Sequence, residues 1–154
     1  MNSYEAITSL LKTNSVKYKE LEHDPIYTTE DAAKVPGLFL ESGAKSMLLK
    51  AKDKFVLVVM SGDKKLDSKK LKKVLGIKDL RFASPAEVKD KMGCIVGACY
   101  PFGSIANLET LLDKSLLDQS EISINPGLHH KSILLNIEDF VMVEKPQIVD
   151  VSAV

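Results

Sequence analysis

The stretch SMLLKAKDKFVLVVM, residues 46–60, decides the fold of this chain. Two apolar runs, residues 46–51 and 55–60, are rich in residues that favour strands and are joined by the polar turn Lys-Asp-Lys. Such a pair of runs predicts a β-hairpin. The apolar run that follows Lys45 is expected to be a buried strand.

Helices are predicted on both sides of the hairpin. Residues 3–14 place Tyr4, Ile7 and Leu11 on one helical face. Capping patterns mark three more helices. Their signals are Thr28 with Asp31 before residues 29–35, Asp67 or Ser68 before a helix that Gly76 ends, and Ser84-Pro85-Ala86-Glu87 before a helix that Gly93 ends.

Further strands are predicted at residues 79–83, 121–125 and 131–137. Strands and helices alternate irregularly, and hairpins are mixed with helical connections. This pattern favours an α/β fold with a mixed, largely antiparallel sheet over a doubly wound parallel one. A length of 154 residues without repeat or linker predicts a single domain over residues 1–154.

Composition excludes several classes of protein. With 45% hydrophobic and 27% charged residues the chain has the make-up of an ordinary globular protein, and no apolar stretch has the length of a membrane span. The first residues lack a basic region followed by an apolar run, so we expect no secretion signal and a cytoplasmic location. Cys94 and Cys99 suggest neither a disulfide framework nor a zinc site, and we expect reduced thiols.

Charge is unevenly spread although the net charge is zero. Residues 43–91 carry 14 basic and 6 acidic side chains, a net of +8, whereas residues 1–42 and 105–154 are net −3 and −5. Such a segment can present a positive face to a polyanion. Only Arg81 among the 21 basic residues is an arginine, which favours contact with phosphates over the reading of base edges.

The loop Gly97-Ala98-Cys99-Tyr100-Pro101-Phe102-Gly103 follows an apolar run that we expect to be a strand. Glycine allows a ligand to approach the backbone closely, and proline fixes the direction of the chain. Exposed N–H groups in such a loop can hold an anion or the oxygen of a polarised carbonyl. A tight turn at a sheet corner explains the glycines equally well and is favoured on that pattern alone.

Lys45 stands alone between Gly43-Ala44 and an apolar strand, whereas most lysines of this chain occur in groups. The default for any single lysine is a solvated surface side chain. The setting of Lys45 favours a second interpretation. A partly desolvated ammonium at the mouth of a strand suits the binding of a phosphate or a developing oxyanion.

A second candidate turn, Asn125-Pro126-Gly127, ends a predicted strand. Asn125 can offer its amide to a substrate or serve as an ordinary turn residue. His129 and His130 have no acidic or cysteine ligand at a matching spacing, so we expect no metal. Cys99 lies among apolar neighbours and is expected to be a buried, inert thiol.

The run KKLDSKKLKKVLGIK, residues 64–78, is the most basic part of the chain. Because the core accounts for its apolar positions, the solvated side of an amphipathic helix is favoured over nucleic-acid contact. The lysines that keep the second possibility open are Lys69, Lys70, Lys72 and Lys73. The chain contains no P-loop, dinucleotide fingerprint, serine nucleophile elbow or metalloprotease helix, and we expect no cofactor.

Six segments in order resemble one known family. TTEDAAKV, GAKSMLLK, a lysine-rich helix after LD, LRFASPAEV, GACYPFG and INPGLHHKSILLNIEDF are similar to the YbaK/prolyl-tRNA synthetase-associated editing domains, from about residue 20 to residue 143. The resemblance implies an α/β domain with a mixed, β-barrel-like sheet and flanking helices. It implies a trans-acting hydrolase that cleaves the ester of a mischarged tRNA, with Ala- or Cys-tRNA(Pro) the first candidates.

The resemblance also implies roles for residues. Lys45 falls on the nearly invariant lysine of the family, Gly97 and Pro101 fall on its glycine-x-x-x-proline loop, and these three are the predicted catalytic residues. The predicted substrate contacts are Ala98, Cys99, Tyr100, Phe102, Gly103, Asn125, Gly127 and His130. Lys69, Lys70, Lys72 and Lys73 are predicted to contact tRNA. Cys99, Tyr100 and the turn NPGLHH depart from the usual family residues.

The partners that follow are aminoacylated tRNA and prolyl-tRNA synthetase, with no membrane, for a monomer or weak homodimer. Three alternatives stay open on the sequence: a non-catalytic module that binds aminoacyl-tRNA or an amino acid, an enzyme for another small acyl ester, and an interaction domain for a synthetase. Turnover of mischarged tRNA distinguishes a deacylase from all three alternatives.

Overall fold

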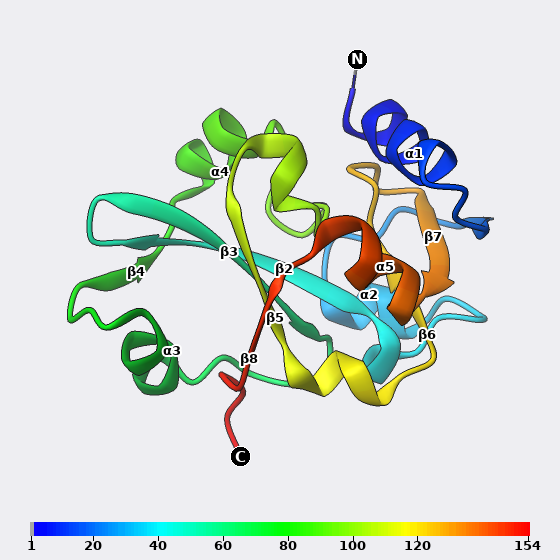
Figure 1. Cartoon of the computed structure of the whole chain (residues 1–154). Helices are drawn as coiled ribbons and strands as arrows, with labels where there is room; N and C mark the ends of the chain where they lie inside the picture. The colour runs from blue at the N-terminus through cyan, green and yellow to red at the C-terminus, as the bar shows by residue number, and fades with distance from the viewer. Residues whose placement is uncertain (1) are drawn as a thin grey trace.

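The computed structural model describes residues 2–154, for Thr29 the backbone alone, and places the strands in two sheets (Figure 1). The larger sheet has five strands and the smaller has three. In spatial order the larger contains β4 (Leu80–Phe82), β2 (Ala44–Ala51), β3 (Lys54–Ser61), β5 (Glu109–Asp113) and β8 (Gln147–Val149). The smaller contains β1 (Tyr18–Glu22), β7 (Lys131–Asn136) and β6 (Glu121–Ile124).

The predicted hairpin is confirmed as β2 and β3, which pair antiparallel from Ala44 opposite Ser61 to Ala51 opposite Lys54. The chain turns at Lys52, which has a positive φ of 62°. β5 pairs with β3 and β8 pairs with β5 in parallel, so the larger sheet is mixed, as predicted. The barrel-like closure that the resemblance implied is not found, because the two sheets are separate and open.

Side chains of β3 point alternately into two cores. Leu57 and Val59 pack into a large cluster with the smaller sheet and helices. Val56, Val58 and Met60 pack into a second cluster on the opposite face. A strand covered on both faces has no polar positions, which accounts for the unbroken apolar run.

Four of the five helices of the described residues lie where the sequence predicts them, and the last one along the chain was not predicted. The helices are α1 (Ser3–Thr13), α2 (Thr29–Ala33), α3 (Ser68–Leu75), α4 (Pro85–Met92) and α5 (Ile137–Glu144), with short 3-10 turns η1 (Leu40–Ser42), η2 (Gly103–Ala106) and η3 (Lys114–Asp118). Thr28 with Asp31 and Ser84 with Glu87 form capping boxes, and Gly76 and Gly93 end their helices in the left-handed conformation. No helix within residues 2–154 is long and apolar enough to cross a membrane.

One local expectation is wrong. The apolar run before Gly97 forms no strand, and Ile95 and Val96 are 65% and 57% exposed. The run belongs to a loop between α4 and η2 rather than to a sheet. Ile95 and Val96 therefore lie at the surface.

Candidate functional site

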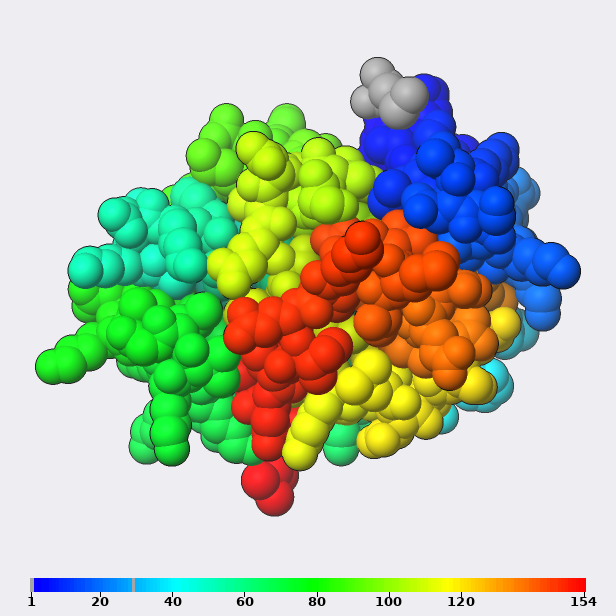
Figure 2. Space-filling model, viewed as in Figure 1, coloured from blue at the N-terminus to red at the C-terminus, as the bar shows by residue number. Residues whose placement is uncertain are grey.

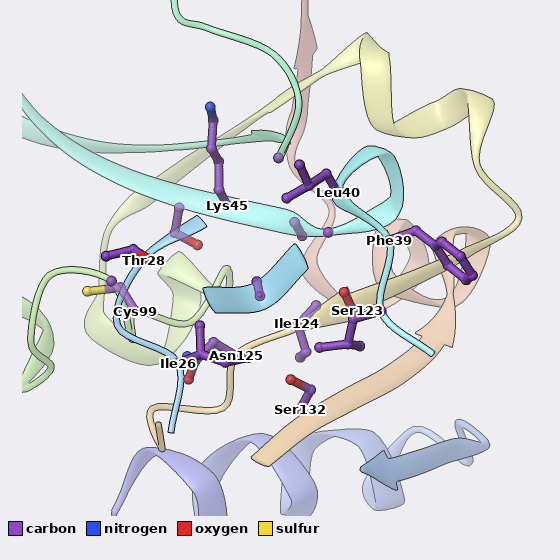
Figure 3. A pocket seen from close by; sticks show the side chains of 17 residues that line it. Ile26, Thr28, Phe39, Leu40, Lys45, Cys99, Ser123, Ile124, Asn125 and Ser132 are labelled. Carbon is purple, nitrogen blue, oxygen red and sulfur yellow. The ribbon is translucent and has the colours of Figure 1, made fainter. Parts of the chain in front are cut away.

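A cavity of about 170 Å³ opens where the two sheets meet (Figure 3). The sheets are joined here by a bridge between Gly43, before β2, and Ser123 of β6. The walls come from five stretches that lie far apart in the sequence. They are residues 26–46, Gly62, Gly97 with Cys99, residues 123–125 and Ser132.

Lys45 lies at one side of this cavity, as the isolated lysine of the sequence suggested. Its side chain is partly buried, and its Nζ donates a hydrogen bond to the backbone carbonyl of Lys64. Burial lowers the pKa of the Lys45 ammonium; nearby Asp63 raises the pKa and Lys65 lowers it further. In Figure 3 the Lys45 side chain extends away from Asn125 and Ser132. It therefore places a positive charge at the rim of the cavity.

The glycine loop contributes Gly97 and Cys99 to the cavity. Gly97 has a φ of +96°, and a Cβ at this position would lie 2.6 Å from the carbonyl oxygen of Tyr27. Glycine is required here on both counts. Within residues 2–154 the backbone N–H groups of Gly97 and Cys99 make no hydrogen bond, so both donors are available beside the cavity.

The other predicted loop residues are buried and do not line the cavity. Ala98 and Gly103 use their N–H groups inside the protein, on Ile95 O and Thr110 Oγ1. The hydroxyl of Tyr100 donates to the carbonyl of Met92 over 2.8 Å, and Phe102 packs against Phe140 at 5.1 Å between ring centroids. Pro101 is buried in the same loop. None of these five residues lines the cavity.

The expectation of reduced thiols is wrong for this structure, because Cys94 and Cys99 form a disulfide. Their Cα atoms are 5.5 Å apart, within the range that a disulfide spans. The bond closes the short loop that contains Gly97. Two cysteines five positions apart gave no sequence signal for this pairing, because only the turn between them brings the sulfur atoms together.

The double variant Cys94→Ser/Cys99→Ser should lose about 2 kcal/mol of unfolding free energy, the entropy that a short closed loop removes from the unfolded chain. Urea unfolding of the protein and the variant, both without reductant, measures the difference. The single variant Cys94→Ser is the control for the changed side chain. Equal stability of the double variant and the parent, or two thiols that react with Ellman's reagent in the unreduced parent, would contradict the disulfide.

The turn Asn125-Pro126-Gly127 is both structural and part of the cavity. The Oδ1 of Asn125 accepts hydrogen bonds from the N–H groups of Gly127 and Leu128, at 2.8 and 3.1 Å. Asn125 also lines the cavity, so its side-chain NH₂ is the group left to face it. Gly127, with φ +91°, packs against the side chain of Ser3, which leaves no room for a Cβ.

The two histidines after this turn lie outside the cavity lining. The Nδ1 of His129 is 2.9 Å from the carbonyl oxygen of Ile26, and its ring packs on Tyr27 at 4.4 Å. His130 is exposed. Within the described residues no group of three or more His, Cys, Asp or Glu side chains is arranged to hold a metal ion.

The lysines of α3 differ in exposure and in whether the ammonium group is bound to other residues. Lys69 and Lys73 are exposed and Lys72 is partly exposed, whereas the Nζ of Lys70 donates to the carbonyl of Ser152 and lies 3.6 Å from Asp150. Lys70 thus ties α3 to the C-terminal segment. In Figure 2 the green residues of α3 form a projecting part of the surface beside the red C-terminal segment.

Several cavity residues were missed in the sequence. They include Ile26, Thr28, Ser46, Ser123 and Ser132. Ser46 is notable because its Oγ is the one buried side-chain polar atom in the described part of the chain without a hydrogen-bond partner. Isolated serines in strands carry no pattern that tells which face they occupy, so only the packing of the two sheets identifies them.

Comparison with known proteins places this geometry in context. The family description "Aminoacyl-tRNA editing domain" matches residues 23–142. The chain is 28% identical over 153 residues to the "Multifunctional Ser/Thr-tRNA deacylase ProXp-y" of Escherichia coli K12, covering 96% of this chain and 92% of the relative. It is 30% identical over 151 residues to the "Prolyl-tRNA editing protein ProX" of Acetoanaerobium sticklandii, covering 94% and 92%.

Two further similarities concern the fold and a larger enzyme. A crystal structure of a candidate trans-editing enzyme for prolyl tRNA synthetase superposes with a TM-score of 0.85 at 23% identity, over 100% of this chain and 99% of the other. The proline–tRNA ligase of Thermosipho melanesiensis is 33% identical over 101 residues, which is 65% of this chain and 18% of the ligase. The same fold thus occurs alone, and similar sequence occurs within a synthetase.

Proposed function

Since the chain belongs to the aminoacyl-tRNA editing domain family, it is a hydrolase of the deacylase type, and we propose that it clears small amino acids from mischarged tRNA in trans. One observation carries this proposal: a small cavity has a cation, Lys45, at its rim and two unused backbone N–H groups, of Gly97 and Cys99, beside it. An aminoacyl ester is already activated, so it needs a placed water and a polarised carbonyl rather than a strong base.

In the proposed reaction the Lys45 ammonium binds the terminal phosphate or a ribose oxygen of the tRNA. The N–H groups of Gly97 and Cys99 stabilise the carbonyl oxygen as negative charge develops on it. Water adds to the carbonyl carbon and passes its proton through the neighbouring ribose hydroxyl toward the ribose oxygen that leaves. The bond from carbonyl carbon to ribose oxygen then breaks, and the ribose oxygen leaves as a hydroxyl.

Selectivity is proposed to come from the size and polarity of the cavity. Alanine and cysteine on tRNA(Pro) are the first candidates, with the larger proline excluded by sterics. A second candidate is serine or threonine, favoured by the hydroxyl groups of Ser46, Ser123 and Ser132 in the lining. The name of the Escherichia coli relative, a Ser/Thr-tRNA deacylase, agrees with this second candidate.

A panel of charged tRNAs tests the function. Purified protein is mixed with alanyl-, cysteinyl-, seryl-, threonyl- and prolyl-tRNA, each on its own tRNA and on tRNA(Pro), and release of the amino acid is measured. We expect release of one or more of the four small amino acids and sparing of proline on tRNA(Pro). Retention of charged tRNA without turnover would instead support a binding module, and cleavage of simple esters with indifference to RNA would support another esterase.

A further inference from the structure

The ring of His23 connects a backbone carbonyl to a serine of the cavity. Its Nδ1 lies 2.8 Å from the carbonyl oxygen of Asp24, and its Nε2 lies 2.8 Å from the Oγ of Ser132. A carbonyl oxygen can only accept, so Nδ1 carries the hydrogen. In the neutral ring Nε2 is then an acceptor, and Ser132 donates its single hydroxyl hydrogen to it.

This bond fixes what Ser132 offers to a ligand. Ser132 lies on β7, is 6% exposed and lines the cavity. With its hydrogen committed to His23, its oxygen presents only lone pairs to the cavity. Asn125 is the converse case, because its oxygen already accepts two backbone N–H groups and its NH₂ remains as a donor. The cavity therefore has an acceptor at Ser132 and donors at Asn125 and Lys45.

We propose that Ser132 binds the α-ammonium group of the aminoacyl ester, with His23 as the positioning residue that holds the serine oxygen as an acceptor. The inference rests on the proposed function and assigns a direction to the substrate. The ammonium lies toward Ser132, and the phosphate and ribose lie toward Lys45, on the other side of the cavity in Figure 3. Repulsion between Lys45 and the substrate ammonium disfavours the reverse direction.

The same bond could prepare Ser132 as a nucleophile, because a serine that donates to an oriented histidine is also the arrangement of covalent catalysis. Here the group that orients His23 is a neutral carbonyl rather than a carboxylate, which gives little stabilisation to a protonated ring. We therefore favour ammonium binding. The nucleophilic role is an outcome that the following experiment detects.

The experiment compares alanyl-tRNA with propionyl-tRNA, the same ester without the α-amino group, in single-turnover reactions with excess enzyme. Ser132→Ala should slow hydrolysis of alanyl-tRNA about 10- to 100-fold, the effect of losing a hydrogen bond to a charged group. The same variant should cleave propionyl-tRNA within about twofold of the parental rate, since that ester has no ammonium to bind. If the panel identifies serine as the substrate, seryl- and 3-hydroxypropionyl-tRNA replace this pair.

Equal losses on both esters would overturn the inference and, with trapped acyl-Ser132 in mass spectrometry, would establish a nucleophile. No loss on either ester would also overturn it. A parental protein inactive on every charged tRNA would instead show that the proposed function has failed. The three results are distinct, so failure of the inference is not confused with failure of the function.

Variants of His23 test its positioning role through the ratio of the alanyl to the propionyl rate. His23→Leu should lower the ratio, because the freed Ser132 hydrogen can point toward the ammonium. His23→Gln, whose side-chain oxygen can accept that hydrogen, should restore part of the ratio. His129→Leu is the matched control, because His129 also bonds a nearby backbone carbonyl but does not contact Ser132. An unchanged ratio in His23→Leu would overturn the role of His23.

Discussion

Lys45→Ala should lower deacylation of the preferred mischarged tRNA by about 100-fold or more, because the lost ammonium no longer holds the phosphate or ribose oxygen and so no longer positions the ester against the N–H groups of Gly97 and Cys99. The lysine is partly buried and hydrogen-bonded only to the carbonyl of Lys64 among the described residues, so the fold does not depend on its charge. The fold should remain intact, with little change in the melting temperature. Release of the amino acid under single-turnover conditions measures the loss, and circular dichroism checks the fold.

Lys19→Ala is a suitable control for this experiment. Lys19 also lies on a strand, but its ion pair with Glu121 is exposed and outside the cavity. The control should keep the parental rate. If Lys45→Ala cleared its substrate as fast as the parent, the catalytic role of Lys45 would be wrong whatever the shape of the cavity.

The pH dependence of the deacylation rate is a second test of the role of Lys45. Burial lowers the pKa of its ammonium from the ordinary value of 10.5. The charged form is the active one in the proposed reaction, so activity should be full below the lowered pKa and should fall as pH rises through it. Lys45→Arg, which stays charged, should remove this alkaline decline if it retains activity. The measurement is the rate of propionyl-tRNA hydrolysis against pH after subtraction of spontaneous ester hydrolysis, because that ester has no ammonium that also titrates.

Raising salt from 50 to 200 mM should weaken binding of charged tRNA by about 20-fold or more, if three lysines each contact a phosphate. The lysines are Lys69, Lys72 and Lys73 of α3, which are at least partly exposed. Lys64 and Lys65 lie in the loop between β3 and α3. The carbonyl of Lys64 accepts a hydrogen bond from Lys45, so this loop links the helix to the rim of the cavity. Replacing the three by alanine should reduce the slope of log affinity against log salt by about 2 to 3.

A second triple variant, Lys12→Ala/Lys17→Ala/Lys19→Ala, removes the same charge from α1, the following turn and β1, outside the basic segment. Its salt slope should equal that of the parent. Lys70→Ala should change stability more than affinity, because the Lys70 ammonium is already bound to Ser152 and Asp150. A flat salt response of the parent, or equal slopes for both triple variants, would remove α3 from the tRNA interface.

Short-range sequence patterns predicted much of the fold. The β2–β3 hairpin and the capping boxes at Thr28 and Ser84 depend on residues a few positions apart, and the sequence predicted them. Missed were β1, β5 and β8, which pair with strands remote in the chain, and α5, which follows β7 directly. The long-range pairing of these three strands leaves no short-range signal, whereas α5 has a local one in its cap Asn136 and the acidic residues of its first turn.

The candidate site likewise contains residues that a local pattern indicated and residues that only the fold brings together. Lys45, Gly97 and Asn125 were singled out from their immediate neighbours, and all three line the cavity. The pair His23 and Ser132 is separated by 109 positions and becomes visible only when β1 lies beside β7. Tyr100 and Phe102 were predicted to contact substrate because they lie in or beside the glycine-x-x-x-proline loop that the resemblance implies at the site, but the loop folds them into the core.

The position of the cavity, where the two sheets meet, has a consequence for how enzymes with this fold diverge in evolution. Because the cavity takes one wall from β2 and another from β6 and β7, its width depends on how the two sheets pack, and the Gly43–Ser123 bridge is their main-chain link. Substitutions deep in the shared core, such as at Leu57 or Ile133, can therefore alter which acyl group is accepted without altering any group that touches it. Substrate preference can change in evolution while the residues that line the cavity stay the same.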